Sequence, residues 1–334
     1  MTSQRRFTTV LAPEFRPYDQ CGPFSLPLER TACVRSVPAL TLLQPGVGFQ
    51  LRSRQEAGLR KVKEVTEGWK MKTKFTYLVG ATYLIEVGSF RFLSDPGFDP
   101  EGTEKSEGPG HDLRKNMAPP LPVEKVGRID AVFVSHAHHF DNLDNTGKAW
   151  LPKWGKVLTH PDAAKLLEAS NVKAEGLATW ASTELTNEAG EHVKVTLTPA
   201  VHTNNPDIRG AVGETTGFLL EWEGQTNGGL LITGDSVWID DFEEIEKRYK
   251  VGTAILHMGA ANVPAVGDNR LTMNGVEGAR LTETLNLKNA FPAHFEGWLH
   301  YKEGREKMGE AFDKAGMADR LNLLKPGGSC EIEV

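Results

Sequence analysis

The stretch FVSHAHHFDNLD, residues 133–144, joins the end of an apolar segment to a group of imidazole and carboxylate side chains. His136, His138, His139 and Asp141 lie within six consecutive positions. The residues before them, IDAVFV, are apolar and rich in β-formers, which predicts a buried strand that ends where the histidines begin. Potential ligands crowded at the end of a buried strand indicate a binding site.

The bulk composition is that of a globular protein. The chain has 334 residues, 39% of them hydrophobic, which is enough for one large α/β domain or two small ones. Its formal net charge is −6 and its pI is about 6.0, without a long basic tract, so the electrostatic field that attracts nucleic acid is missing. No segment approaches the ~18 consecutive apolar residues of a membrane span. We therefore expect a soluble protein whose partner is a small-molecule substrate, and the oligomeric state is left open.

Cysteine usage indicates a reducing compartment. Cys21, Cys33 and Cys330 are an odd, widely spaced set without a C-x-x-C motif, which argues against a disulfide framework and against a thiolate zinc site. The N-terminal residues include twin arginines but no apolar signal-peptide core. We expect a cytoplasmic protein, and the Arg-rich composition of residues 1–60 leaves an organelle transit segment open.

The Pro- and Gly-rich start of the chain and the patterned remainder predict two parts. Residues 1–70 are expected to form an irregular N-terminal extension, with a short helix at 53–69, packed on a main domain of residues 71–334. From residue 74 the segment FTYLVGATYLIEVGSFRFLSDPGF alternates β-formers around two glycines, which predicts a β-meander. Predicted strands and helices then alternate as far as residue 294. That order is typical of an α/β fold in which two sheets are sandwiched between helices.

Polar side chains recur at the ends of the predicted strands. His202, Asp235 and His294 each end an apolar strand, as the group beginning at His136 does. Because strand ends at one edge of a scaffold converge, we expect these residues to meet there. Imidazole and carboxylate groups without a thiol suit zinc, manganese or iron, so the sequence predicts a metal site.

The remaining histidines have simpler interpretations. His111, His160 and His192 lie in loop-like or polar contexts, and we assign them no role in the site. His257 lies in an apolar segment, AILHMG, and is interpreted as a core histidine with satisfied hydrogen bonds.

Several motifs together carry a resemblance to a known family. SHAHHFDNLD, PAVH, ITGDS and FPAHFEGW follow one another in the order and approximate spacing of the metallo-β-lactamase superfamily. The segment GATYLIEVGSFRFLSDPGFDP resembles the opening of its UlaG-like branch of hydrolases. The resemblance covers residues 74–330 and implies an αββα sandwich with the metal in a shallow cleft along the sheet edges.

The resemblance also implies roles for single residues. Asp95, in LSDPGF, matches an acid that supports the metal site by hydrogen bonding. His202 completes a first metal position, Asp235 bridges or joins it, and His294 belongs to a second. The implied cofactor is zinc, as one or two ions, with Mn²⁺ or Fe²⁺ as alternatives.

The His-rich loop departs from the family pattern His-x-His-x-Asp-His, because it has one residue more before the acid. Either His136 and His138 are the usual pair and the loop carries an insertion, or His139 takes the place of the second histidine. A His-x-x-His-x-Asp-Asn-Leu-Asp form that resembles some UlaG-like sequences favours His136, His139 and Asp141. Asn142 stands where the second-site histidine is expected, and an amide oxygen is a poor ligand for a transition metal. A single ion, or two of unequal affinity, is therefore expected.

The expected activity is hydrolysis by a metal-bound hydroxide, because a divalent ion lowers the pKa of its bound water to ~7. The substrate is expected to be a small ester, lactone, amide or phosphodiester, with a lactone or another carboxylic ester favoured. Asp141 or Asp235 is the expected general base. Glu296, Trp298 and His300 are candidates for lining the substrate pocket, although core packing explains Trp298 equally well.

Two other functions stay open at this point. Asn142 and the irregular spacing of the histidines also fit a metal-binding sensor or scaffold without turnover. A phospholipase-type phosphodiesterase is a third hypothesis. In the small-molecule hydrolase, the polar, Gly- and Pro-rich loop 100–120 is expected to act as a lid.

Overall fold

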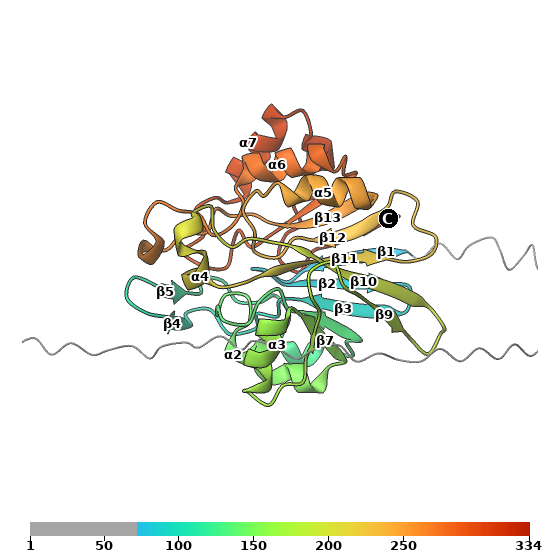
Figure 1. Ribbon diagram of the computed structural model, residues 1–334, viewed down its shortest axis with the longest axis horizontal. Helices are drawn as coiled ribbons and strands as arrows, with labels where there is room; N and C mark the ends of the chain where they lie inside the picture. Colours follow the sequence, from blue (N-terminus) through green and yellow to red (C-terminus); the bar gives the residue numbers. More distant parts are fainter. Residues whose placement is uncertain (1–71) are drawn as a thin grey trace, which may run out of the picture. The chain divides into compact units, whose positions relative to one another are not determined.

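The computed structural model describes residues 72–334, which fold into two β-sheets packed face to face between helices (Figure 1). The predicted N-terminal extension of residues 1–70 and the predicted helix at 53–69 lie outside the described residues. No helix between residues 72 and 334 is long and apolar enough to cross a bilayer.

The first sheet has the strand order β15-β1-β2-β3-β6-β7-β8. Its strands are β1 (Thr73–Tyr77), β2 (Tyr83–Val87), β3 (Phe90–Ser94), β6 (Ala131–Phe133), β7 (Lys156–Thr159), β8 (Glu175–Gly176) and β15 (Ser329–Ile332). The antiparallel pairing of β1 with β2 and of β2 with β3 confirms the predicted meander. From β3 to β8 the neighbours are parallel, so β3, β6 and β7 end at the same edge of the sheet.

The second sheet has the order β14-β13-β12-β11-β10-β9. Its strands are β9 (Ser182–Thr186), β10 (His192–Pro199), β11 (Thr216–Glu221), β12 (Gly229–Ile232), β13 (Val251–His257) and β14 (Asn289–Ala293). β12, β13 and β14 are parallel to one another, and β10 and β11 are antiparallel. The three parallel strands therefore carry the residues that follow them, Asp235 and His294 among them, to one edge.

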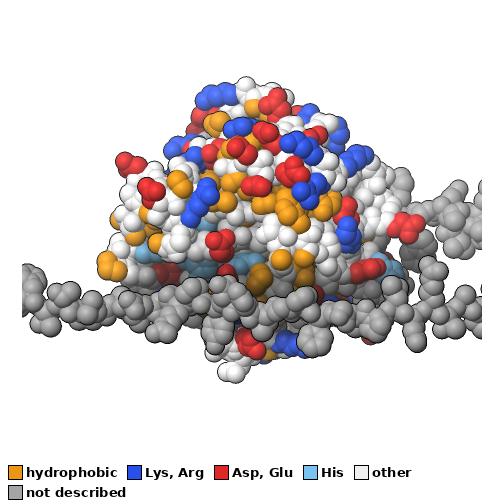
Figure 2. All heavy atoms as spheres, viewed as in Figure 1, with side chains coloured by type: hydrophobic (Ala, Val, Ile, Leu, Met, Phe, Trp, Pro, Cys, Tyr) orange, Lys and Arg blue, Asp and Glu red, His pale blue; other side chains and the backbone are white. Residues whose placement is uncertain are grey.

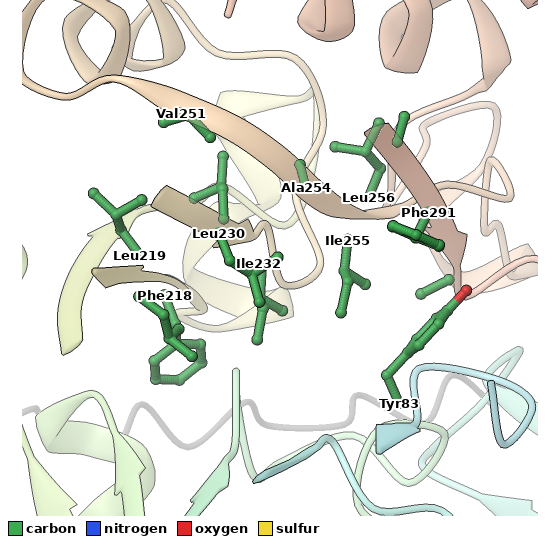
Figure 3. Packing of buried hydrophobic residues seen from close by; sticks show 14 of the residues in the cluster. Tyr83, Phe218, Leu219, Leu230, Ile232, Val251, Ala254, Ile255, Leu256 and Phe291 are labelled. Atoms are coloured by element: carbon green, nitrogen blue, oxygen red, sulfur yellow. The ribbon is translucent and has the colours of Figure 1, made fainter. Parts of the chain in front are cut away.

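Aromatic side chains fill the space between the sheets. Phe133 of β6 packs against Phe218 of β11 with ring centroids 5.2 Å apart, and Phe75 of β1 stacks on Phe291 of β14 at 4.5 Å. Tyr83 of β2 points up toward Phe291 in Figure 3, and its hydroxyl donates to the carbonyl oxygen of Pro292 at 2.9 Å. These contacts join strands of the two sheets at the end where the polar residues gather.

Helices cover the outer face of each sheet (Figure 1). α2 (Asn145–Trp150) and α3 (Pro161–Glu168) lie on the first sheet, and α5 (Asp241–Arg248), α6 (Gly275–Thr284) and α7 (Arg305–Lys314) lie on the second. α3, α5, α6 and α7 each bury a few apolar side chains, such as Ala163 and Leu167 of α3, and leave a charged face exposed, whereas α2 buries only Gly147. The architecture is thus the αββα sandwich that the sequence predicts.

Two short elements lie beside the sheet edge that carries the polar residues (Figure 1). One is a hairpin of β4 (Glu104–Ser106) and β5 (Asp112–Arg114), which forms in the loop 100–120. The other is α4 (Arg209–Val212). The sequence pattern missed the hairpin because its strands have three residues each and are mostly exposed.

Candidate metal centre

Three imidazoles from two segments face one another at the sheet edge. His136 and His139 follow β6, and His202 follows β10; their ligand nitrogens all lie within 4.8 Å of one another. His136 Nδ1 is hydrogen-bonded to Ser135 Oγ at 2.9 Å, and His202 Nδ1 donates to the carbonyl oxygen of Leu271 at 2.9 Å. Since a partner at Nδ1 fixes the ring and leaves Nε2 as a lone-pair donor, both rings are oriented as in metal-binding histidines.

A second group lies directly beside the first. It consists of Asp141, Asp235 and His294, whose ligand atoms also lie within 4.8 Å of one another. Asp141 Oδ2 accepts hydrogen bonds from His294 Nε2 at 2.9 Å and from His300 Nε2 at 2.8 Å. Two carboxylates and an imidazole are a donor set that suits a divalent ion of the zinc class.

Asp235 lies between the two groups. Its Oδ1 accepts from His257 Nδ1 at 2.8 Å and from Asn142 Nδ2 at 3.3 Å. Its Oδ2 has no hydrogen-bond partner among the described residues and lies 4.0 Å from His136 Nε2, 4.0 Å from His202 Nε2 and 3.1 Å from His294 Nε2. One oxygen of the carboxylate is therefore fixed while the other points to the space shared by both groups.

The charges of the buried groups fit a cation. Burial lowers the pKa values of His136, His139 and His202, so these rings are neutral and offer lone pairs. Burial opposes ionisation of Asp141 and Asp235, but hydrogen bonds and nearby histidines outweigh it and hold both pKa values well below the ordinary range.

His294 balances part of this negative charge. Burial lowers its pKa, but Asp235 and Asp141 more than offset that effect and raise it to about 10. Two buried atoms support the same conclusion, since His136 Nε2 and Asp235 Oδ2 have no hydrogen-bond partner in the part of the chain that the structure describes. A divalent ion would bind the buried ligand atoms that lack a hydrogen bond and would neutralise the excess carboxylate charge. The residues present therefore fit a metal.

Backbone strain marks two residues of the centre. Asp95 has φ 33° and His294 has φ 59°, a left-handed region that non-glycine residues seldom adopt. Asp95 Oδ1 accepts the backbone N–H of Ser135 at 2.7 Å, directly before His136. The left-handed turn at His294 follows β14 and brings its ring back over Asp141. Both conformations position side chains of the site, which is where such strain is concentrated in proteins.

The structure distinguishes the three consecutive candidates of the His-rich loop. His138 lies outside both groups, and its Nε2 contacts the carbonyl oxygen of Val212 at 2.7 Å. His139 Nδ1 instead lies 2.8 Å from His202 Nε2. The register anchored at Asp141, with His136 and His139, is the one whose donor atoms the fold brings together. Asn142 lies between Asp235 and His294, with its Oδ1 3.2 Å from His294 Nε2.

The candidates for substrate binding fall into different environments. Glu296 accepts from Arg305 with both carboxylate oxygens, at 2.9 Å from Nε and 2.5 Å from Nη2. Trp298 is buried and packs edge-on against Phe140. Only His300 reaches the metal centre, through Asp141. Substrate binding by these residues stays a prediction.

Four residues of the region have no role in the sequence-based prediction. His257 is fully buried, as expected, but its Nδ1 bonds to Asp235. Its Nε2 has no hydrogen-bond partner within residues 72–334 and lies 3.9 Å from Asp95 Oδ2, so it is not the satisfied core histidine of the sequence interpretation. The hydroxyl of Tyr301 donates to Asp141 at 3.4 Å. Glu107 and His111 come from the β4–β5 hairpin. His257 ends a strand, as the predicted donors do, and this was the signal that could have found it; the other three follow no such pattern.

Among these additional residues, Glu107 has a pKa that is brought close to neutrality. Burial, together with the negative charge of Asp141, raises its pKa to about 7. Its Oε1 accepts the backbone N–H of Phe140 at 2.7 Å, between His139 and Asp141. The hairpin is therefore bonded directly to the His-rich loop.

A cluster of buried apolar side chains packs beside the centre. This mouth cluster, as we call it, packs residues from the hairpin, the His-rich loop, α4 and the loops after β13 and β14: Leu113, Phe140, Val212, Ala261, Val263, Leu271 and Trp298. On the face shown in Figure 2, histidine side chains (pale blue) gather on the side where the hairpin and α4 lie. Buried apolar side chains therefore lie next to the polar donors, a combination that is usual in small-molecule sites.

Comparison with known proteins identifies similar sequences. A family model described as beta-lactamase superfamily domain matches residues 90–295, more than half of the chain. A metal-dependent hydrolase of the archaeon Korarchaeum cryptofilum is 24% identical over 259 residues, which cover 78% of this chain and 99% of the relative.

Solved structures share the fold. An isothiocyanate hydrolase from gut bacteria of Delia radicum superposes with a TM-score of 0.65 at 22% identity, covering 78% of this chain and 99% of its own. A possible metal-dependent hydrolase of Veillonella parvula gives a TM-score of 0.66 at 19% identity, with 79% and 100% coverage. At these identities the likeness concerns the fold.

Proposed function

Because the chain belongs to the β-lactamase superfamily and is a metal-dependent hydrolase, we propose that it uses zinc to hydrolyse a small ester, lactone or amide. The observation that carries this proposal is the position of Asp235. Its free Oδ2 points into the space between the three histidines on one side and Asp141 and His294 on the other. A carboxylate in this position can act as a metal ligand together with either set.

His136, His139 and His202 would hold a first ion, with Asp235 as a further ligand. Asp141, Asp235 and His294 would hold a second. Asn142 occupies the place of a better donor beside the second set, so we expect that position to bind more weakly. Nitrogen and carboxylate ligands without thiolate support zinc, with Mn²⁺ and Fe²⁺ as the alternatives.

When bound, zinc supplies Lewis acidity and a water acidic enough to react at neutral pH. The chain supplies the proton acceptor. Whichever of Asp141 and Asp235 is not fully engaged as a ligand would be the general base; Asp141 Oδ2 accepts from His294 and His300, and Asp235 Oδ2 lies 3.1 Å from His294 Nε2. Hydrogen bonds from His294 and His300 hold Asp141 in place and lower its pKa, and the hydroxyl of Tyr301 donates to the same oxygen.

The mouth cluster supports an uncharged substrate. Its side chains are apolar, and they would exclude water from the reacting group and bind a hydrocarbon portion. Lys115 lies beside Trp298, but its ammonium group is committed to Asp144 at 3.1 Å. These features favour an ester, lactone or amide over a phosphodiester.

A metal-binding sensor of the same fold is the second candidate, and Asn142 is the observation that favours it. The loss of one imidazole from the second donor set is compatible with a metal that binds without turnover. The hydrolase and the sensor differ in turnover and not in metal content, so one set of measurements separates them.

The test combines elemental analysis with a substrate panel. The full chain, purified without chelator, is analysed for transition metals and assayed on carboxylic esters, lactones, amides, phosphodiesters and an isothiocyanate, the last because a protein of the same fold hydrolyses one. We expect bound zinc and turnover of an ester or lactone. Asp235→Asn should remove both, whereas Asp240→Asn, at an exposed position, should leave both unchanged.

Each other outcome has a definite meaning. Tight metal binding without turnover on any substrate class would favour the sensor. A protein that contains no transition ion and rebinds none on titration would overturn the proposal.

A further inference from the structure

The β4–β5 hairpin carries two potential metal ligands toward the His-rich loop. Glu107 and His111 flank its turn, where Glu107 N–H donates to the carbonyl oxygen of His111 at 2.8 Å and His111 N–H donates to that of Gly108 at 3.0 Å. Gly108 and Gly110 have φ values of 138° and 74°, a backbone conformation that is strained for any residue with a side chain. This tight turn places the carboxylate and the imidazole side by side.

Their separation is that of two ligands on one metal ion. Glu107 Oε2 lies 3.3 Å from His111 Nε2, but the geometry is not that of a hydrogen bond, and Oε2 is buried without a partner among residues 72–334. In a tetrahedral zinc site with bonds of about 2.0–2.1 Å, neighbouring ligand atoms lie about 3.3 Å apart. The pair therefore has the spacing that a shared ion requires.

His139 supplies a third donor. Its ligand atom lies within 4.8 Å of those of Glu107 and His111, and the His111 and His139 rings meet edge to face with centroids 5.3 Å apart. His139 Nδ1 faces His202, so Nε2, on the opposite side of the ring, is the nitrogen left for the hairpin. The bond from Phe140 N–H holds Glu107 Oε1 and thereby directs Oε2 toward the two imidazoles.

We propose that Glu107, His111 and His139 form an outer site for a divalent cation of the zinc class, distinct from the inner centre (the two donor groups described above) and sharing His139 with it. Because a neutral imidazole has a single lone pair, His139 would serve both ions as an imidazolate, and its ring proton would be released to solvent when the second ion binds. Two histidines and one glutamate make a ligand set typical of zinc sites that keep an open position. Glu107 and His111 are partly exposed, with 12% and 19% of their side-chain surface accessible, which leaves that position to solvent or substrate.

An ordinary surface pair looks different in the same protein. His192 Nδ1 lies 2.8 Å from Glu184 Oε1, yet more than half of each side chain is exposed. No third potential ligand joins them in the described part of the chain, unlike the pair on the hairpin. His192 and Glu184 therefore provide a built-in control for the outer site.

Zinc stoichiometry tests the proposal without reference to activity. The full-length protein is stripped of metal and dialysed against buffered free zinc, and bound zinc is counted by elemental analysis over a range of concentrations. We expect Glu107→Gln and His111→Gln each to bind one equivalent fewer than wild type, with more than about 100-fold weaker affinity at that position, because each removes a direct ligand. The zinc ions bound at the inner centre should keep their affinity in both variants.

Controls cover folding and specificity. Glu184→Gln and His192→Gln should bind as much zinc as wild type, and circular dichroism of the metal-free proteins verifies the fold. If Glu107→Gln does not fold, His111→Gln, at a more exposed position, gives the same readout. An unchanged stoichiometry in the hairpin variants would refute the outer site, and so would the loss of every equivalent, which would place these residues in the inner centre.

The failure of this proposal differs from the failure of the proposed function. If the hairpin variants lose one equivalent while the inner centre binds none, the outer site stands and the hydrolase mechanism falls. If the inner centre binds zinc and the hairpin variants match wild type, the reverse holds.

Discussion

At the scale of single residues, His138 and His139 are neighbours in the chain but have different surroundings. His139 faces His202 within the first donor group, whereas His138 contacts the backbone of Val212 in α4. The extra residue of the loop is thus accommodated by turning His138 away from the centre. His138 then contacts Val212 while His139 faces His202, so the lengthened loop still brings donors to one point.

Substitution of these two histidines tests that arrangement. His139→Ala should lose metal and at least about 100-fold in activity, because it removes a donor from the centre. His138→Ala should retain metal and most activity, since it removes a contact to a backbone carbonyl. Metal content and initial rates of the two purified variants provide the measurement. An inactive His138→Ala protein beside an active His139→Ala protein would assign the ligands to the other register.

At the scale of elements, a buried ion pair fastens the β4–β5 hairpin to the sheet edge. Lys115 follows β5, and its Nζ donates to Asp144 Oδ2 at 3.1 Å and to the carbonyl oxygen of Gly97 at 3.2 Å. Only 2% of the Lys115 side chain and 0% of the Asp144 side chain are exposed. Asp144 also caps α2 through Gly147 N–H. One carboxylate therefore joins the hairpin, the loop after β3 and the start of α2.

Removing the lysine charge should destabilise the fold. Lys115→Met keeps the length of the side chain but leaves the Asp144 carboxylate without its cation, for which we expect a loss of about 3–5 kcal/mol in the free energy of unfolding. Denaturant titration measures it. Lys165→Met, which breaks the exposed pair with Asp162, is the matched control and should leave the free energy of unfolding almost unchanged. Equal small losses would show that the buried pair does not fasten the hairpin.

At the scale of the whole molecule, burial of histidines couples stability to pH. Burial lowers the pKa values of His136, His202 and His257, and it lowers the pKa of His160, which precedes α3, to about 4. An unfolded chain takes up these protons near pH 6.5. Between that pH and the lower folded-state values the unfolded state binds more protons, so stability decreases as the pH falls.

His160 gives this effect a measurable size. The contribution of His160 to the free energy of unfolding is present above pH 6.5 and is lost as the pH falls toward about 4. The loss amounts to about 2 kcal/mol between pH 7 and pH 5. Unfolding of metal-free wild type and His160→Gln at the two pH values isolates it, with His192→Gln as the exposed control. A His160→Gln protein that loses as much stability on acidification as wild type would contradict the assignment.

The sequence by itself determined the αββα class and the positions at which donors end the strands. Both depend on local patterns: the alternation of β-formers predicts strands, as in β1 to β3, and polar residues at strand ends predict an edge site. The match to the superfamily confirms the fold and the metal-dependent hydrolase, while the UlaG-like branch, the zinc and the lid function of loop 100–120 stay predictions.

Only the tertiary structure decided which neighbouring histidine faces the centre and which unpatterned residues join it. Glu107 reaches Phe140 across 33 positions, and Tyr301 reaches Asp141 across 160, so neither contact leaves a trace in local spacing. The orientation of an imidazole depends on which carbonyl, hydroxyl or carboxylate lies against its second nitrogen. That partner is set by how distant loops pack, and packing is a property of the folded chain as a whole.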